Sequence, residues 1–590
     1  MLCGLRAGRV VPSALTRKSL AEIGAVYFGM SGRLEFILAS GWFIAFIVLS
    51  FVHVFYREFN SDEMQHLHVL WSWTRGSVQY RDIFDNHMPL FHLAFAPICG
   101  LIGPRASIIY WMRLVMLPLS FISVWCAYKI ATRLFSPRAG VWAAIALAFF
   151  NIYNVFALQF RPDNLATPLW LLCLLTLLDR EMTGRRALVA GLLLGFCFAV
   201  SIKSTVFLLS CTTSLALCLA VLRWQNQPIS LRNLTRCGAT FLAATALVPG
   251  MIALFFAWKG VWPAFRYCVF DFNFLAGQLY HKQLLYRARP GLALTILAAG
   301  AAVGAYVATR LLHYSRERNT AFRRVFVLFL CLAYFFILKI FWPPLSRPYA
   351  ELYPLLFALF VAGVLSISHQ LARSRPGLNS VALFLPTVIV VAELIISFAT
   401  RPLREKATAE EVNLLRNVLA LTKPSDPVFD CKGETVFRAR GYRPVLERIT
   451  MRAIRNGVLA DDLPERCIET HNCVVATIFR KRFSAAARDF VRQNYLPVAK
   501  DLRVAGTALH RSAQDPHQLT FDVVIPADYA IISPDGDVVG TLDGKVYDGP
   551  RSLSAGPHVF EQTVPGSNSL ILLWARAAER HYMPLNTRHS

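Results

Sequence analysis

Long apolar segments recur along this chain as far as residue 399, and they constrain its fold more than any other feature. A helix that crosses a bilayer needs about 20 mainly apolar residues. From length and spacing we predict about eleven spans. They are residues 34–56, 107–134, 140–158, 164–179, 187–202, 205–222, 237–258, 290–312, 325–342, 352–369 and 379–399. A 590-residue chain that is 55% hydrophobic is therefore expected to be a mainly helical, polytopic membrane protein.

The residues after 399 have the composition of a water-soluble region. Residues 400–510 alternate helical patterns with short β-like runs, which indicates a small α/β region. Residues 511–590 alternate short strands with turn residues, which indicates a β-sandwich. We therefore expect residues 1–33 as an N-terminal segment, 34–399 as a transmembrane domain with its first external loop at 57–106, and these two regions at the C-terminal end.

The charge pattern predicts the orientation. The net charge is +25, and much of the excess lies in short loops between the apolar segments. The positive-inside rule explains this better than nucleic-acid binding does, so no nucleic-acid partner is expected. Basic loops and the N-terminus are then cytoplasmic, and an odd number of spans places the C-terminal region outside. The run 34–56 lacks a cleavage site and is expected to be a retained signal anchor.

The loop after the first span, Asn60–His92, gathers carboxylates, histidines and aromatic side chains. A carboxylate at the outer membrane boundary suits a general base, whereas the alternative is an ordinary solvated acid. Turn-forming residues that bond their own backbone are the alternative for its later part. The candidates are Asp62, Glu63, Asp82, Asp85 and His87.

Two further interpretations of this loop remain open. Asp62 and His66 lie one helical turn apart and, with His68, are candidate ligands of a divalent metal, although spacing fixes no third strong ligand. No other cofactor is expected. Trp71 either packs on a sugar or lipid or belongs to an interfacial aromatic belt.

Other polar residues lie at predicted external turns. Basic groups there either clamp a phosphate or reach for the membrane interface, and an acid beside them either positions a substrate or pairs with them. The candidates are Arg161, Asp163, Lys203, Arg347 and Tyr349. The external loop 258–289 is unusually basic, which indicates either an anionic lipid headgroup or an error of one span. Cys467 and Cys473 are left as either a short disulfide or free thiols.

At this point the order of motifs resembles the bacterial members of the protein O-mannosyltransferase superfamily, related to the lipid A aminoarabinose transferases. The motifs are Asp62-Glu63, the run from Tyr80 to Leu90, the Arg161-Pro162-Asp163 turn, Lys203 and the turn from Arg347 to Pro354. The resemblance covers residues 34–370. Many relatives have Lys where this chain has His87.

The resemblance implies a GT-C fold in 34–399 and a sugar donor linked to a polyprenyl phosphate. It also implies that the sugar passes, with inversion, to an acceptor hydroxyl of a glycan, lipid or protein. Asp62 would be the base, and Glu63 and Asp163 would position the acceptor or tune Asp62. Lys203 and Arg347 would stabilise the departing phosphate. The site would face the periplasm of a bacterial inner membrane. A transporter or flippase, or a non-catalytic binding protein for lipid-linked sugars, is the alternative.

Overall fold

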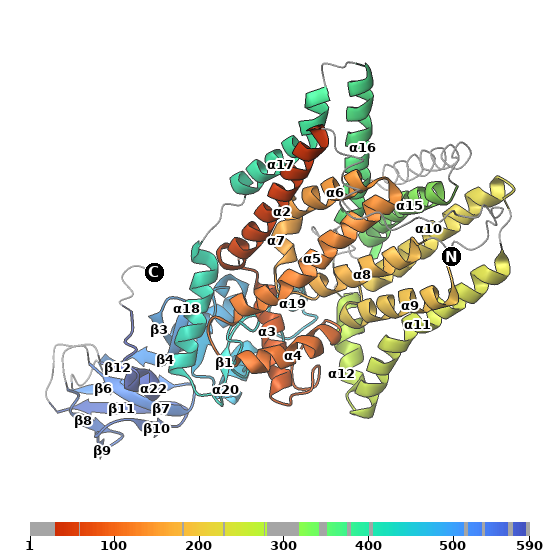
Figure 1. The fold of residues 1–590 in the computed structure, drawn as a ribbon. Coiled ribbons are helices and arrows are strands. Elements are labelled where there is room, and N and C mark those ends of the chain that lie inside the picture. Colours follow the sequence, from red (N-terminus) through yellow and green to blue (C-terminus); the bar gives the residue numbers. More distant parts are fainter. Residues whose placement is uncertain are drawn as a thin grey trace. The chain divides into compact units, whose positions relative to one another are not determined.

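A computed structural model of the chain describes residues 30–57, 59–179, 182–227, 230–275, 278–279, 318–341, 351–374, 379–400, 405–511, 517–533, 537–563 and 570–585. The described part is mainly helical, with β-structure near the C-terminal end (Figure 1). It divides into two compact units. The first comprises Met1–Arg57, Asn86–Phe91 and Met112–Arg404, and the second comprises Glu58–Asp85, His92–Trp111 and Glu405–Ser590.

The described part of the first unit is made of helices, most of them apolar. They are α2 (Met30–Tyr56), α5 (Ile108–Leu134), α6 (Pro137–Phe149), α7 (Asn151–Ala157), α8 (Asp163–Leu177), α9 (Gly184–Val200), α10 (Ser204–Trp224), α11 (Leu231–Trp258), α12 (Trp262–Arg266), α15 (Arg318–Phe341), α16 (Tyr353–Ser374) and α17 (Asn379–Thr400). A short π-helix, Tyr267–Asp271, follows α12. Among the described residues, six helices are long and apolar enough to cross a membrane, or seven if the bent pair α6–α7 counts as one.

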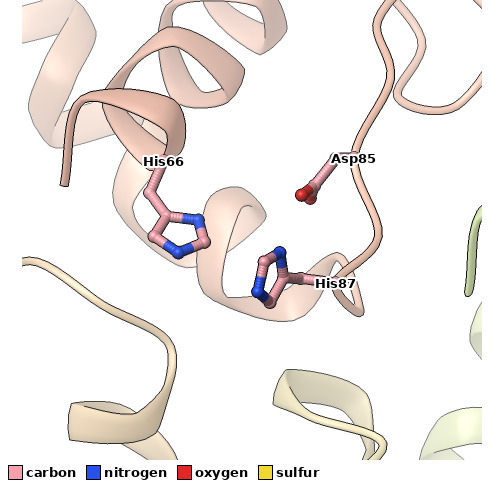
Figure 2. Close-up of side chains that lie close together, drawn as sticks. All are labelled: His66, Asp85 and His87. Carbon is pink, nitrogen blue, oxygen red and sulfur yellow. The ribbon is translucent and has the colours of Figure 1, made fainter. Parts of the chain in front are cut away.

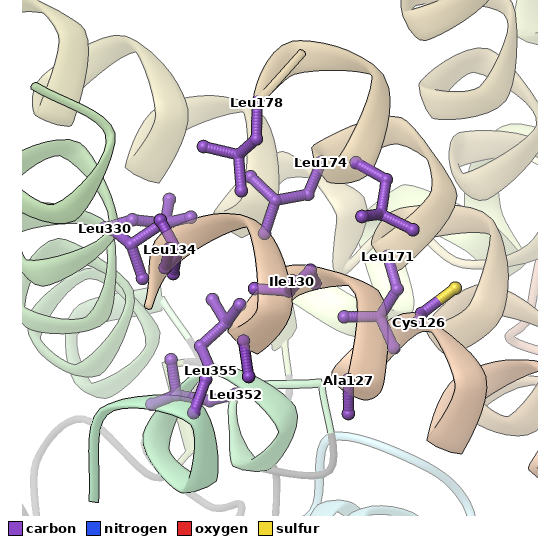
Figure 3. Packing of buried hydrophobic residues seen from close by; sticks show 14 of the residues in the cluster. Cys126, Ala127, Ile130, Leu134, Leu171, Leu174, Leu178, Leu330, Leu352 and Leu355 are labelled. Atoms are coloured by element: carbon purple, nitrogen blue, oxygen red, sulfur yellow. The ribbon is translucent and has the colours of Figure 1, made fainter. Parts of the chain in front are cut away.

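The core of the first unit is an apolar helix bundle. In Figure 3, side chains of α5 meet those of α8, α15 and the start of α16. The labelled residues are Cys126, Ala127, Ile130, Leu134, Leu171, Leu174, Leu178, Leu330, Leu352 and Leu355. Helices α9 and α11 pack closely at Gly191, which has no side chain. A Cβ at this position would lie 2.4 Å from the Phe241 carbonyl oxygen. Small residues at such contacts are typical of helices that pack within a membrane.

The second unit joins α3 (Ser61–Thr74) and most of α4 (Leu90–Ile102) to the C-terminal region. Its helices there are α18 (Glu405–Leu421), α19 (Arg448–Arg455), α20 (Leu463–Glu469), α21 (Ala485–Asn494) and α22 (Ala575–Glu579), with a 3-10 turn at Arg480–Arg482. Its strands are β1 (Val428–Phe429), β2 (Val474–Ala476), β3 (Tyr495–Ala499), β4 (Leu502–Ala508), β5 (His510–Arg511), β6 (Gln518–Val523), β7 (Ala527–Ile532), β8 (Gly540–Leu542), β9 (Lys545–Val546), β10 (Arg551–Leu553), β11 (Gly556–Gln562) and β12 (Ile571–Trp574).

These strands form two sheets. One has the order β1-β2-β4-β12-β7-β10, with β3 also paired to β4, and the other has the order β5-β6-β11-β8-β9. All pairs are antiparallel except β1–β2, where Val428 is in register with Val474. The first sheet takes strands from both sides of residue 510, where the sequence pattern divides an α/β region from a β-sandwich. Strand β12 pairs with β4, and its residues Leu572, Leu573 and Trp574 belong to the same apolar core.

The predicted fold class, helical and polytopic with a C-terminal region containing β-strands, is confirmed. Several predicted spans coincide with helices, and the predicted span 290–312 lies outside the described residues. The predicted span 140–158 is broken instead, since α6 and α7 are bent by 71° at Phe150. Cys467 and Cys473 are buried free thiols, so the disulfide alternative is wrong. Their side chains have separate partners, the Asn472 amide and the His471 carbonyl.

Candidate functional site

The two adjacent acids at the start of α3 have different environments. Asn60 is the N-cap residue, and its side-chain oxygen accepts a hydrogen bond from the Asp62 N–H at 3.0 Å. The Glu63 carboxylate turns back to accept from the Asn60 N–H at 3.3 Å and completes a capping box. Glu63 is fully buried, whereas the Asp62 side chain keeps 27% of its surface exposed. The helix start therefore uses Glu63 in its cap and leaves the Asp62 carboxylate partly exposed.

A lysine from the C-terminal region contacts Asp62. The Lys432 ammonium donates a hydrogen bond to Asp62 Oδ1, and a second carboxylate oxygen, Glu447 Oε2, lies 3.7 Å away. Only 6% of the Lys432 side chain is exposed. A buried ammonium is costly without anionic partners, so the two carboxylates explain how Lys432 is accommodated.

The loop that carries Lys432 follows β1 and is held by its own buried polar groups. Asp430 accepts hydrogen bonds from the Gly433 N–H at 2.8 Å and the Thr435 N–H at 2.9 Å, and it pairs with Arg440 at 2.7 Å. Burial alone would raise the pKa of Asp430, but Arg440 and the hydrogen bonds from Thr435 hold it below its usual value. The loop therefore keeps a fixed, ionised carboxylate at its centre.

The same loop packs directly on α3. Gly433 has φ of +89°, and a Cβ there would lie 2.9 Å from the His68 Cβ. His68 Nδ1 lies 2.8 Å from the Val436 carbonyl oxygen, which only accepts, so this nitrogen carries the proton. Burial lowers the pKa of His68 to about 4, so its ring is neutral at pH 7. His68 thus anchors α3 to the C-terminal region as a neutral donor.

A second polar chain runs beside α3. His66 Nδ1 lies 3.0 Å from His92 Nε2, and His92 Nδ1 lies 3.5 Å from Asp85 Oδ2. The amides of Gln79 and Gln65 donate to the two Asp85 oxygens at 2.6 and 3.3 Å. Figure 2 shows His66 on α3 and Asp85 on the loop that follows. Asp85 and His92 are fully buried, so this chain is an internal network and not a solvated linker.

The first unit has its own charged cluster at the ends of two helices. Lys203, just before α10, donates to Asp163 Oδ1 at 2.7 Å, and Arg161 lies 3.3 Å from the other Asp163 oxygen. Each of the three side chains keeps between 21 and 24% of its surface exposed. All three are candidates from the sequence, and the structure brings them together. Two cations on one carboxylate leave this cluster with net positive charge, which suits an anionic ligand.

A buried acid near this cluster was missed. Glu351, which directly precedes Leu352 and α16, is 5% exposed and accepts a hydrogen bond from the Tyr334 hydroxyl at 3.3 Å. Burial, and next the charge of Asp163, raise the pKa of Glu351 to about 7. The signal was its position beside a predicted span, where ionisable residues are seldom without a role. Lys432 gave no comparable signal, since it is 370 residues from Asp62.

The remaining candidates differ in their surroundings. Asp82 pairs with Arg81 at 2.8 Å on the surface, and Trp71 stacks on His68 with ring centroids 5.8 Å apart. His87 is half-buried and follows Asp85 by two residues (Figure 2). Arg347 and Tyr349 lie outside the described residues.

The three metal-ligand candidates have separate partners. Asp62 pairs with Lys432, His66 with His92 and His68 with the Val436 carbonyl. Among the described residues, Asp62, His66 and His68 do not form a cluster of metal-ligating atoms. The structure thus gives this particular ligand set no support.

Comparison with known proteins agrees with this architecture. Residues 87–252 match the family described as dolichyl-phosphate-mannose-protein mannosyltransferase. The crystal structure of ArnT from Cupriavidus metallidurans bound to undecaprenyl phosphate aligns with a TM-score of 0.50 and 12% identity, over 79% of this chain and 98% of ArnT. The oligosaccharyltransferase AglB from Archaeoglobus fulgidus, in complex with an inhibitory peptide and a dolichol-phosphate, aligns with a TM-score of 0.45 and 11% identity, over 80% of this chain and 73% of AglB. No curated protein matches.

The fold and the family match identify the class as membrane glycosyltransferases with the GT-C fold. The resemblance to the protein O-mannosyltransferase superfamily agrees with the family match over residues 87–252, and the ArnT structure shows the same fold. The chain is therefore a multi-pass membrane protein and an enzyme.

Proposed function

We propose that this glycosyltransferase moves a sugar from a polyprenyl-phosphate donor to an acceptor hydroxyl of a glycan, lipid or protein. Asp62 is the general base. The observation that carries this assignment is the difference between the two acids at the start of α3. Glu63 is buried and accepts the capping hydrogen bond, whereas Asp62 keeps a partly exposed carboxylate that pairs with Lys432. This differs from a positioning role for Glu63, which the family resemblance implied.

The reaction requires one proton transfer. The acceptor oxygen attacks the anomeric carbon from the face opposite the phosphate, and the hydroxyl proton passes to the Asp62 carboxylate. The bond between the anomeric carbon and the phosphate oxygen breaks, and its electron pair leaves with the polyprenyl phosphate. Attack from the opposite face inverts the anomeric configuration. The leaving group is a stable phosphate anion, so no protein acid is needed.

Cations of the first unit suit the leaving phosphate. Lys203 and Arg161 together exceed the single charge of Asp163, and preformed cations of this kind stabilise charge that develops as the bond breaks. Asp163 orients both. Arg347, Tyr349, Asp82, Asp85, His87 and Trp71 stay predicted contacts of the sugar, the phosphate or the lipid. The related ArnT structure contains undecaprenyl phosphate, which supports a lipid donor of this class.

The charge pattern supports a location. Basic loops place the N-terminus in the cytoplasm, and we place the C-terminal region and Asp62 on the periplasmic side of a bacterial inner membrane. The donor is then a sugar linked to a polyprenyl phosphate on the periplasmic face of the membrane.

The test is transfer of radiolabel by the full-length protein in detergent, from a panel of undecaprenyl-phosphate sugars that includes mannose. Wild type is expected to release label to an acceptor or water, and Asp62→Asn should lower turnover at least about 100-fold, as loss of a general base does. Asp501→Asn is the matched control, since Asp501 is also a partly exposed carboxylate paired with a cation, Arg480, at 2.9 Å.

Two results would contradict this proposal. Full activity of Asp62→Asn would remove Asp62 from the base role. Binding of undecaprenyl phosphate without turnover by wild type on any donor would favour a transporter or a binding protein for lipid-linked sugars.

A further inference from the structure

The ion pair between Asp62 and Lys432 joins the proposed base to a region outside the predicted transmembrane domain. The ammonium is nearly buried, and its neighbours Asp62 and Glu447 are carboxylates. Ion pairs on an open surface contribute little because water screens them, whereas in this one the Lys432 side chain is 6% exposed and the Asp62 side chain 27% exposed. The ammonium therefore lies where it can orient the Asp62 carboxylate.

The backbone around Lys432 leaves it little freedom. Its own N–H donates to Glu434 Oε2 at 2.6 Å, and the next residue, Gly433, lies against Gln65 and His68 of α3. On the other side, Arg482 donates to the Ser61 hydroxyl at 3.1 Å, one residue before Asp62. The lysine is thus fixed against the first turn of α3 by contacts that do not involve its side chain.

The groups around the pair are charged or titratable. Glu447 faces the ammonium, Glu434 lies at its backbone, Glu63 adjoins Asp62 in the chain, and Arg482 lies at Ser61. Glu434 has a second partner, the Thr477 hydroxyl at 2.8 Å. Lys432 is the ammonium that directly contacts the Asp62 carboxylate.

We propose that Lys432 is a positioning residue of the transferase: it holds the Asp62 carboxylate in one orientation and favours its ionised form. This inference rests on the proposed function, in which Asp62 is the base. A base must be ionised to accept a proton, and a neighbouring cation extends its ionised range to lower pH. The helix N-terminus at Asp62 acts in the same direction. The C-terminal region thereby takes part in catalysis without contacting substrate.

The test is the pH dependence of kcat for wild type, Lys432→Gln and Lys432→Arg, with the undecaprenyl-phosphate sugar that wild type turns over. In Lys432→Gln the acid limb is expected to move up by about one pH unit, because the favourable charge is gone. Turnover at pH values on the acid limb should then fall about tenfold, with KM for the donor nearly unchanged. Lys432→Arg keeps the charge and should restore most of the wild-type profile.

Controls separate this inference from folding and from the proposed function. Lys500→Gln removes another lysine–carboxylate pair, with Glu410 at 2.6 Å on an exposed surface, and should leave the profile unchanged. If Lys432→Gln fails to fold, Glu447→Gln remains informative, since it leaves the ammonium to Asp62 and should move the acid limb downward.

A wild-type profile in folded Lys432→Gln, or no shift in Glu447→Gln, would overturn the positioning role. If Asp62→Asn is inactive while Lys432→Gln matches wild type, this inference fails alone. If Asp62→Asn is active, the proposed base fails first.

Discussion

Single residues decide which of two neighbouring acids is available for chemistry. Asn60 and Glu63 have the spacing of a capping box, which is readable from sequence as a helix start. The spacing is compatible with Glu63 in the cap, and the hydrogen bond from the Asn60 N–H establishes it. Lys432 could not have been found in this way, because no spacing rule connects residues 370 positions apart.

His68 gives a prediction for the pH dependence of stability. Burial lowers its pKa to about 4 in the folded protein, against about 6.5 in the unfolded chain. Between these values only the unfolded chain binds the proton, so stability falls as pH drops through this window. His68 alone lowers the free energy of unfolding by about 2 kcal/mol at pH 5. Glu434, whose pKa burial raises to about 7, acts in the opposite direction.

The measurement compares thermal unfolding in detergent at pH 7 and pH 5 for wild type and His68→Gln. The glutamine amide can still donate to the Val436 carbonyl but does not titrate. The decrease in Tm between the two pH values should be smaller in His68→Gln, and Glu434 contributes equally to both proteins. Equal decreases would show that His68 is not buried as a neutral ring.

At the scale of elements, the contact between α9 and α11 depends on glycine. A Cβ at Gly191 would lie 2.7 Å from the Ala244 Cβ as well as 2.4 Å from the Phe241 carbonyl oxygen. Gly191→Ala should therefore force the helices apart and destabilise the protein by about 1 to 3 kcal/mol. Gly250 on α11 has open space around its Cβ position, and Gly250→Ala should be neutral or stabilise by up to about 1 kcal/mol.

Thermal unfolding of the two variants in detergent checks this prediction. A Tm for Gly191→Ala at or above that of Gly250→Ala would mean that α9 and α11 do not pack so closely.

Apolar length predicted most transmembrane elements, since α5, α10, α11, α15 and α16 coincide with expected spans. The break between α6 and α7 was not predicted because no Pro or Gly lies at Phe150, the residue where the helices separate. The pattern of apolar residues continues through the bend. The position of the bend therefore depends on tertiary packing and not on the local sequence.

At the scale of the whole molecule, the sequence indicated two parts but not which residues belong to each. Composition separates the apolar spans from the region after residue 399, because the two differ in how apolar they are. It does not show that Glu58–Asp85 forms one compact unit with the C-terminal region. The contacts responsible are hydrogen bonds such as that from Arg443 to the Tyr80 carbonyl, at 2.5 Å, between residues far apart in sequence.

Truncation tests the unity of this second unit. A chain that ends at residue 510 lacks β12, which pairs with β4 through Ile571, Leu572 and Leu573. It should lose the C-terminal fold and also the protection of α3, although α3 is far upstream in sequence. Hydrogen exchange of α3 in detergent is the measurement, and a chain that ends at residue 585 is the control. Unchanged protection of α3 in the chain ending at 510 would show that β12 is dispensable.

The pair between Asp62 and Lys432 also sets an order during synthesis. Ribosomes add about 5 to 20 residues per second, so the 370 residues between the two take roughly 20 to 70 s to make. Several membrane helices are made in that interval, before the lysine exists. The proposed base is thus made well before the cation that orients it. A nascent chain cannot complete this ion pair until the C-terminal region has folded against α3, which delays activity until that folding has occurred.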